Sequence, residues 1–345
     1  GILAKNPMEV SAPCRVDMGG TLDISTLHYP LRHLCPCTFN LALDLRTRVR
    51  ITAHTERLVK VSSLGFAHAE FPADDVPFDH SMGLMFAVAA YFGVSGIHMI
   101  IESSSPPRSA LGGSSVAAVA LVAGFSALFE QCGMPSMNRT WIAKSAHAIE
   151  SSVAGVPCGL QDQLAAAYGG VNIWHWNGRI EGVGFRREIA VPQRRYKKLE
   201  RHLLLAYCGE PHDSKDVNGK WLRRFLSGKT RSDWTEIVEC TQNFSAALVR
   251  FDILKAVTMM NREMAIRRKM TPEVLDPVGD LLVDKAVEND CGARFTGAGG
   301  GGCIWALGEP SDISMLRQEW ADILMSVKNA KLLPVVIDEN GILVH

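Results

Sequence analysis

The sequence has no excess of charge of either sign. Its 36 Lys and Arg residues balance 36 Asp and Glu residues in a chain of 345, so bulk charge gives no reason to expect nucleic acid as a partner. No uninterrupted apolar run approaches the roughly 18 residues that predict a membrane span, and the first residues lack a signal-peptide pattern. The longest apolar candidate, 116–129, is rich in Ala and predicts a buried helix. These absences favour a cytoplasmic globular protein with small-molecule partners.

Cysteine is scattered. Of nine cysteines, only Cys35 and Cys37 lie close together, and C-x-C alone is a weak metal signal. The odd count and the apolar settings of several thiols favour reduced cysteines rather than a disulfide framework.

Hydrophobic periodicity predicts an α+β chain of two lobes. Polar and apolar residues alternate along 46–51, which is typical of a half-buried strand. Strands are expected near 8–16, 41–52, 58–62, 98–102, 171–176, 182–189, 203–207, 303–307 and 332–337. Helices are expected near 114–130, 138–152, 161–168, within 232–289, and near 313–327. A basic stretch precedes the strand at 203–207, and we expect the boundary between domains 1–197 and 198–345 there.

One loop has the composition of an anion site. Residues 106–115 read Pro-Pro-Arg-Ser-Ala-Leu-Gly-Gly-Ser-Ser and run directly into the Ala-rich helix. Glycines allow a close backbone approach, and the first N–H groups of a helix have no internal partners and bind anions. A Ser N-cap after a turn gives the same pattern, so the segment alone leaves both interpretations open. It is neither a Walker A loop nor a G-x-G-x-x-G motif.

Two further segments extend this pattern. Residues 12–23 read Ala-Pro-Cys-Arg-Val-Asp-Met-Gly-Gly-Thr-Leu-Asp, and residues 295–303 read Phe-Thr-Gly-Ala-Gly-Gly-Gly-Gly-Cys. With 109–115 between them, they resemble the three ordered motifs of the GHMP kinases, the superfamily of galactokinase, homoserine, mevalonate and phosphomevalonate kinases. The resemblance implies the GHMP two-domain fold, with a ribosomal protein S5 domain 2-like N-terminal domain and a ferredoxin-like C-terminal domain.

A fourth region resembles the sugar-kinase branch. Gly-Leu-Gln-Asp-Gln at 159–163 and Gly-Gly-Val-Asn at 169–172 are most similar to the D-glycero-D-manno-heptose 7-phosphate kinases, with fucokinase and galactokinase further away. The resemblance implies a kinase dependent on ATP and Mg²⁺, monomeric or homodimeric, acting on a hydroxyl, expected to be anomeric, of a sugar or sugar phosphate. A mevalonate- or homoserine-type kinase and a non-catalytic sugar and ATP sensor remain alternatives.

The resemblance also assigns the nucleotide and the metal. Ser115 and Glu150 are implied as Mg²⁺ partners, since a hydroxyl and a carboxylate suit a hard cation. Without the resemblance, Glu150 would be an exposed carboxylate at a helix end. The implied ATP-binding residues are Ser109, Leu111, Gly112, Gly113, Ser114 and Ser115.

Asp162 matches the position of the catalytic base. A carboxylate there can take or orient the proton of the acceptor hydroxyl, although Asp near a helix start is also common for structural reasons. Arg15 lies where relatives have Arg or Lys. It could stabilise developing charge or depress the pKa of Asp162, or it could be a surface residue at a strand edge.

Substrate contacts are expected at the first and third motifs. Asp23 matches a position that binds sugar hydroxyls in relatives, and it could equally be a turn residue. The turn at 297–302 is expected to approach the nucleotide loop. The other implied substrate residues are Gly19, Gly20, Gly297, Ala298 and Gly299. A phosphate on the substrate could meet Arg108, His212 or Lys215, but His212 replaces an expected Arg, which leaves a free sugar open.

Overall fold

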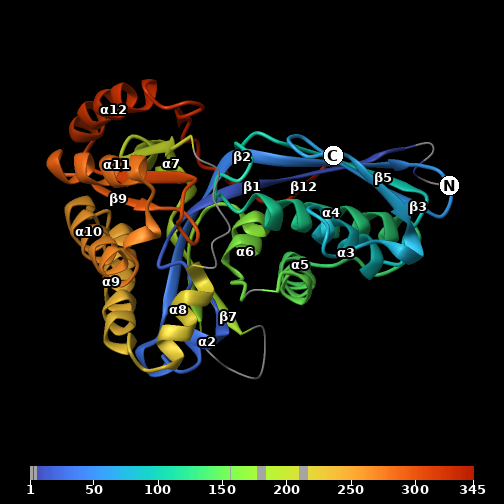
Figure 1. Ribbon diagram of the computed structural model, residues 1–345, viewed down its shortest axis with the longest axis horizontal. Helices are drawn as coiled ribbons and strands as arrows, with labels where there is room; N and C mark the ends of the chain where they lie inside the picture. Colours follow the sequence, from blue (N-terminus) through green and yellow to red (C-terminus); the bar gives the residue numbers. More distant parts are fainter. Residues whose placement is uncertain (1–2, 4–5, 156, 177–183, 210–216) are drawn as a thin grey trace.

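Two β-sheets organise the chain. The computed structural model describes residues 3, 6–155, 157–176, 184–209 and 217–345. Within them, an eight-stranded sheet has the order β12-β1-β2-β5-β3-β4, with β6 paired to β2 and β7 to β6. A four-stranded sheet has the order β11-β8-β10-β9. Helices pack against both sheets (Figure 1), which confirms the α+β prediction.

The first sheet is built mainly from the N-terminal half of the chain. Its strands are β1 (Met8–Met18), β2 (Cys37–Ala53), β3 (Leu58–Ser63), β4 (Ala69–Pro72), β5 (Ile97–Ser103), β6 (Val171–Trp176), β7 (Phe185–Val191) and β12 (Leu343–Val344). The strands of the second sheet are β8 (Leu203–Tyr207), β9 (Gly292–Phe295), β10 (Cys303–Leu307) and β11 (Lys331–Leu333).

The helices fall into two groups. Those that precede β8 are α2 (Ser25–His28), α3 (Gly83–Tyr91), α4 (Gly113–Gln131), α5 (Arg139–Val153), α6 (Gln161–Tyr168) and α7 (Tyr196–Glu200). Those that follow β8 are α8 (Val217–Leu226), α9 (Arg231–Arg250), α10 (Ile253–Met270), α11 (Pro277–Glu288) and α12 (Pro310–Met325). Short 3₁₀ turns lie at Arg32–Leu34, Ala73–Asp75, Gln193–Arg195 and Pro272–Val274.

Helix α4 is the central core helix of the first lobe. Its small Ala and Val side chains let it lie closely against β1 and β2, and α3, α5 and α6 surround it beneath the sheet (Figure 1). Among the described residues, α4 is the one helix long and apolar enough to cross a membrane, but 72% of its most apolar window is buried inside the protein. The burial is that of a core helix, as the Ala-rich segment predicts.

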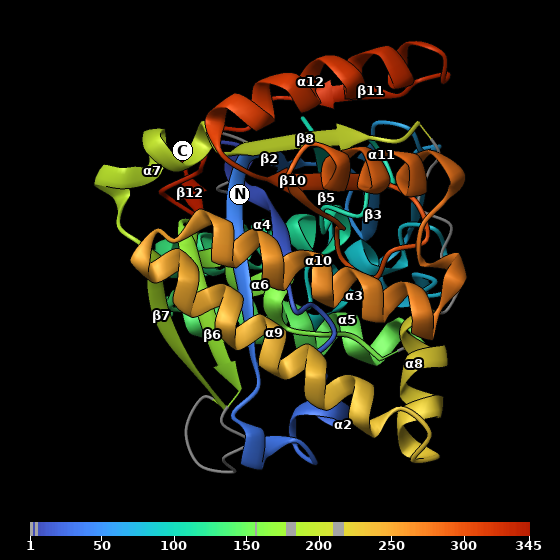
Figure 2. The ribbon, with the colours of Figure 1, turned by 90° about the vertical axis from the view of Figure 1, so that its left-hand side faces the viewer.

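The second lobe stacks helices on its small sheet. Helices α9 and α10 lie side by side (Figure 2), α10 packs on β9, and α9 also reaches β2 and β7 of the first sheet. The two lobes are therefore in contact along β2.

The last part of the chain returns to the first sheet. Ile337 bridges to Leu43, Arg46 bonds the Asp338 side chain, and β12 pairs with β1. The predicted strand 332–337 is therefore wrong beyond Leu333. Pro334 lacks the N–H that a ladder needs, so the chain leaves the second sheet there.

Most other predicted elements are confirmed to within a few residues. The expected strand 182–189 is found as β7, and residues 182–183 lie outside the described residues. The elements that the sequence did not predict are α2, β4, α3, α7, α8, β9 and β12.

Candidate active site

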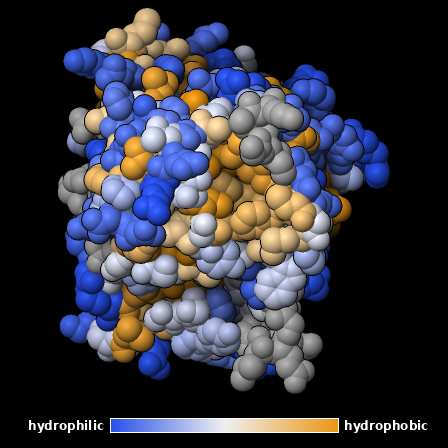
Figure 3. All heavy atoms as spheres, turned by 90° about the vertical axis from the view of Figure 1, so that its right-hand side faces the viewer, coloured by the Kyte–Doolittle hydropathy of each residue, from blue (hydrophilic) through white to orange (hydrophobic). Residues whose placement is uncertain are grey.

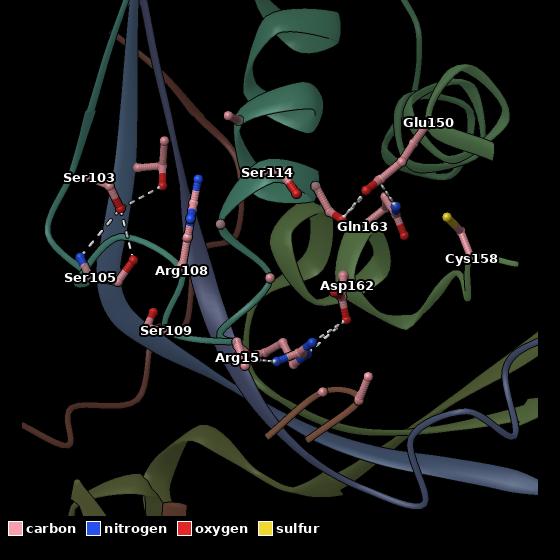
Figure 4. A pocket seen from close by; sticks show the side chains of 18 of the residues that line it. Arg15, Ser103, Ser105, Arg108, Ser109, Ser114, Glu150, Cys158, Asp162 and Gln163 are labelled. Atoms are coloured by element: carbon pink, nitrogen blue, oxygen red, sulfur yellow. Dashed lines mark hydrogen bonds and ion pairs between the residues drawn. The ribbon is translucent and has the colours of Figure 1, made fainter. Parts of the chain in front are cut away.

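A cavity of about 620 Å³ lies between the first sheet, α4, α5 and α6. Residues from three distant parts of the chain line it: β1 and the segment after it, the loop before α4, and the turn at Gly297 and Ala298. Figure 4 shows Arg15 and Asp162 facing one another below the start of α4, with Glu150 beyond Ser114. The structure thus brings the three glycine-rich segments together.

The start of α4 has the form of an anion site rather than a serine cap. The N-cap residue is Gly112 at φ 83°, and no side chain caps the helix. Ser114 is exposed, and Ser115 is buried. Because no side chain of the described residues accepts from the first N–H groups, these groups can bind an anionic ligand.

The turn at 297–302 packs against this loop, as expected. A Cβ on Gly302 would lie 2.6 Å from the Ser109 carbonyl oxygen, and one on Gly297 would lie 3.1 Å from the Ala110 carbonyl oxygen. Glycine at both positions allows the backbone of the second lobe to touch the loop.

Ser115 and Glu150 form a tight pair. The Ser115 hydroxyl contacts Glu150 Oε1 at 3.0 Å and Oε2 at 2.8 Å, and Gln163 Nε2 donates to Oε2 at 2.7 Å. Burial raises the pKa of Glu150 to about 7. Glu150 is therefore not the solvated carboxylate of the alternative interpretation.

This pair fits a magnesium ion that also binds phosphates. Ser115 and Glu150 supply two adjacent oxygen ligands of the kind Mg²⁺ prefers, and phosphate and water oxygens usually complete its shell. Within the described residues, no cluster of three or more His, Cys, Asp or Glu side chains could hold a metal by itself.

Arg15 and Asp162 form the ion pair at the centre of the cavity. Arg15 Nε and Nη2 lie 2.8 and 2.7 Å from Asp162 Oδ1, and Nη1 donates to the Ala110 carbonyl at 2.9 Å. The Arg15 side chain is buried, and Asp162 keeps 22% of its side chain exposed. Arg15 is therefore no surface residue.

The pKa of Asp162 lies above its usual range. Burial is the main cause and Asp17 adds to it, whereas Arg15 and His147 act in the opposite direction. The expectation that Arg15 depresses this pKa is thus correct for the pair alone, but burial outweighs it.

Asp23 is a further carboxylate of the cavity. Its Oδ2 accepts from the Gln161 backbone N–H at 3.0 Å, and burial raises its pKa to about 6. A Cβ on Gly159 would lie 1.7 Å from this oxygen, so glycine there makes room for the carboxylate.

Several implied site residues lie behind the cavity wall. Gly19 packs against Thr241, Gly20 against Asp17, and Gly299 against Val274. None of these three lines the cavity, nor does the buried Leu111. They shape the backbone rather than offer a surface to a ligand.

The residues predicted to meet a substrate phosphate are only partly described. Arg108 lies between Ser105 and Ser114 in the cavity (Figure 4). His212 and Lys215 lie outside the described residues.

The sequence analysis missed two groups of residues. An apolar wall lines one end of the cavity, and Figure 3 shows hydrophobic side chains gathered around a hollow at the end of the molecule that carries β3 and α3. The wall consists of Leu64, Phe66, Met82, Met85 and Ile101. The second group is a set of buried charges around Asp17, and a charged residue inside an apolar strand was the available signal.

Comparisons with known proteins agree with the resemblance of the three motifs to those of the GHMP kinases. The family described as "GHMP kinases N terminal domain" matches residues 81–170. The chain is 28% identical to "Probable glucuronokinase 2" of Arabidopsis thaliana over 197 residues, 54% of this chain and 52% of that protein. The match thus spans about half of that relative. It is 24% identical to mevalonate kinase of Pyrococcus horikoshii over 294 residues, 77% of this chain and 80% of that protein.

Solved structures resemble the whole chain at low sequence identity. A D-glycero-D-manno-heptose 1-phosphate kinase from Bacteriodes thetaiotaomicron superposes with a TM-score of 0.74 at 16% identity, covering 98% of both chains. Galactokinase of Lactococcus lactis, complexed with galactose, gives 0.75 at 17% identity, covering 99% of this chain and 95% of that one. At this identity the likeness shows the fold. Residues 81–170 therefore match the GHMP kinase N-terminal domain, and the chain as a whole has the fold of these kinases.

Proposed function

We propose that this protein is a kinase that transfers the γ-phosphate of ATP to a hydroxyl of a sugar or sugar phosphate. One observation carries the proposal. Asp162, held by Arg15, faces the same cavity as the uncapped start of α4 and the Ser115–Glu150 pair. A base, an anion site and two oxygen ligands in one cavity are the parts that phosphoryl transfer needs.

One part of the cavity suits the phosphate donor, ATP, and another part suits the phosphate acceptor. The apolar wall suits the base of a nucleotide, whose phosphates would then reach Ser114 and the first N–H groups of α4. The acceptor would lie between Asp23 and Asp162, with the Gly297 turn beside it. Arg108 would lie within reach of the phosphates.

The reaction then follows from the residues present. The acceptor oxygen forms a bond to the γ-phosphorus while the bond from that phosphorus to the β,γ-bridging oxygen breaks, releasing ADP. Asp162 takes the proton of the hydroxyl, and its raised pKa makes it a better base than an ordinary carboxylate. Arg15 holds the carboxylate in place, and the α4 start stabilises charge on the phosphates. A Mg²⁺ ion held at Ser115 and Glu150 would neutralise charge on the phosphate oxygens.

A polyol is the acceptor that Asp23 favours. A buried carboxylate with one oxygen bonded to the Gln161 N–H has remaining acceptor capacity for neighbouring hydroxyl groups. Within that class we propose the anomeric hydroxyl of a heptose 7-phosphate or a related hexose. A galactokinase- or fucokinase-like acceptor is the alternative within the same class.

A mevalonate-type acceptor is the second candidate. It is favoured by the match to mevalonate kinase over 80% of that protein's length.

The test is a panel of acceptors with ATP and Mg²⁺. Heptoses, hexoses, glucuronic acid, their phosphates and mevalonate are each assayed for ADP formation, and phosphorus NMR locates the new phosphate. We expect acceptor-dependent ADP with one sugar and a phosphate at one position. Tight binding of sugar and ATP without ADP formation would instead indicate a sensor. Turnover with mevalonate alone would overturn the sugar assignment.

A further inference from the structure

A row of buried charges runs from the cavity into the second lobe. The signs alternate along it, and each member contacts the next. In order, the row consists of Asp162, Arg15, Asp17, Arg294, Glu263 and Arg267.

Asp17 stands at the middle of the row, and its side chain is completely buried. Its Oδ1 accepts from the Gly297 backbone N–H at 2.8 Å and lies 3.8 Å from Arg15 Nη1. Its Oδ2 accepts from Arg294 Nη1 at 3.0 Å. One carboxylate thus contacts the arginine that holds Asp162 and the turn that borders the same cavity from the other lobe.

The far end of the row is anchored in the second lobe. Glu263 on α10 lies between Arg294 and Arg267, at 3.0 and 2.7 Å. Arg267 donates to the Gly20 carbonyl at 2.7 Å, and its guanidinium lies over the rings of Trp221 and Trp234, 4.6 and 4.7 Å from the ring centres. Glu263 therefore holds the Arg294 side chain in place, and Asp17 contacts a partner whose position is fixed.

We propose that Asp17 is a positioning residue, which sets the placement of Arg15 and of the Gly297 turn together, so that Asp162 and the turn meet the substrate in one fixed arrangement. This inference rests on the proposed kinase function. Asp17 touches neither substrate nor nucleotide in this role and acts through its neighbours.

A purely structural role would show in stability alone. Unpairing a buried charge is costly wherever it lies in the row. A positioning role at Asp17 must in addition change turnover and the protonation of Asp162, because the two carboxylates share Arg15.

Loss of the Asp17 charge should change the pKa of Asp162 in one direction. Asp162 is faced by Arg15, Asp17 and Cys14 from β1, by His147 and Glu150 from α5, and by Asp23 and Cys158 from the neighbouring loops. Asp17 raises the pKa of Asp162. Removing the Asp17 charge should therefore lower that pKa and move the acid limb of the kcat profile to lower pH.

The experiment compares Asp17→Asn with Glu263→Gln. Each removes one buried negative charge from the same row, but Glu263 does not touch Arg15. For both we measure the thermal midpoint, kcat, both KM values and the pH profile of kcat. We expect both variants to lose stability. Asp17→Asn should also lose at least about tenfold in kcat and shift its acid limb to lower pH, whereas Glu263→Gln should keep the wild-type limb.

Equal pH profiles and equal kcat values in the two variants would reduce Asp17 to a structural role. If Asp17→Asn does not fold, Gly297→Ala tests the same link, because its Cβ would lie 3.2 Å from Arg15 Nη2. Wild-type kcat and KM in Gly297→Ala would overturn the proposal. Failure of the kinase function itself is seen separately, since the wild-type protein would then form no ADP with any acceptor.

Discussion

The two halves of the cavity are lined by different kinds of chemical groups. The proposed nucleotide half consists of backbone N–H groups, small residues and an apolar wall from the turn after β3, the start of α3 and β5. The acceptor half consists of carboxylates with raised pKa values, each held by specific partners. Side-chain chemistry should therefore matter most in the acceptor half, and backbone shape in the nucleotide half. Five substitutions and one control variant test this difference, from the largest expected effect to the smallest.

The largest effect is expected from Asp162→Asn. The amide keeps the shape of the side chain but cannot take a proton, so kcat should fall by about 10³-fold. Binding of ATP, measured by calorimetry, should stay within a factor of a few because the nucleotide half is untouched. Near-normal turnover would remove Asp162 from the mechanism.

Glu150→Gln should abolish the pH dependence of the magnesium requirement. Because the pKa of Glu150 is about 7, the wild-type carboxyl is protonated below that pH, and the apparent affinity for Mg²⁺ should fall by about tenfold per pH unit. Activity is titrated with Mg²⁺ at several pH values, and the concentration of the Mg–ATP complex in solution is measured in parallel. In Glu150→Gln, activity should fall by roughly 10²-fold.

The same variant should be more stable at pH 8. A carboxyl whose folded pKa is raised contributes stability at low pH that is lost as pH rises through the folded value. The glutamine avoids this loss, and we expect a gain of about 1 kcal/mol in thermal unfolding at pH 8 and little gain at pH 5. Because the amide also changes the hydrogen bonds to Ser115 and Gln163, the decisive comparison is between the two pH values. An equal change in midpoint at pH 8 and at pH 5 would contradict the raised pKa.

Substitution of the two loop glycines should distinguish the effect of backbone strain from the effect of contact with the nucleotide. Gly112 has φ +83°, and its Cβ would lie 3.1 Å from Asp162 Oδ2. A Cβ on Gly113 would meet none of the described residues within 4 Å apart from its chain neighbours and its own helix backbone. Gly112→Ala should lower both stability and kcat. Gly113→Ala should keep its stability, because Ala favours the helix, but should raise the KM for ATP by about tenfold through contact with phosphate. An unchanged KM in Gly113→Ala would place the phosphates elsewhere.

The smallest effect is expected at the apolar wall. Met85→Ala removes buried apolar contact and should raise the KM for ATP about fivefold, with the acceptor KM unchanged. Met134→Ala is the control, because Met134 is 55% exposed and lies outside the cavity lining. Equal effects in both variants would show that the wall does not bind the base.

The parts of this site that are local in sequence could be predicted from it. The helix start after Gly112 and the bounds of α6, β6, β8 and β10 follow from short patterns that need no knowledge of distant residues. The Gly297 turn was predicted to reach the loop because only glycine tolerates such closeness.

The parts that depend on distant pairing could not be predicted. Asp17 and Arg294 are 277 positions apart, and no pattern in either segment predicts that the two side chains are in contact. Glu263 and Arg267 have the i,i+4 spacing of an ordinary surface pair on a helix, yet both are completely buried. The apolar wall is assembled from three separate segments, each too short to stand out.

The return of the chain end to the first sheet has a consequence for synthesis. Strand β1, which carries Arg15 and Asp17, lies between β2 and β12, and Arg46 bonds Asp338 across 292 positions. On the ribosome, residues near 338–344 emerge long after β1, so this side of β1 remains an open sheet edge until they have been made. The nascent chain must therefore protect this edge from other strands, and the strand at the centre of the site gains its second neighbour only then.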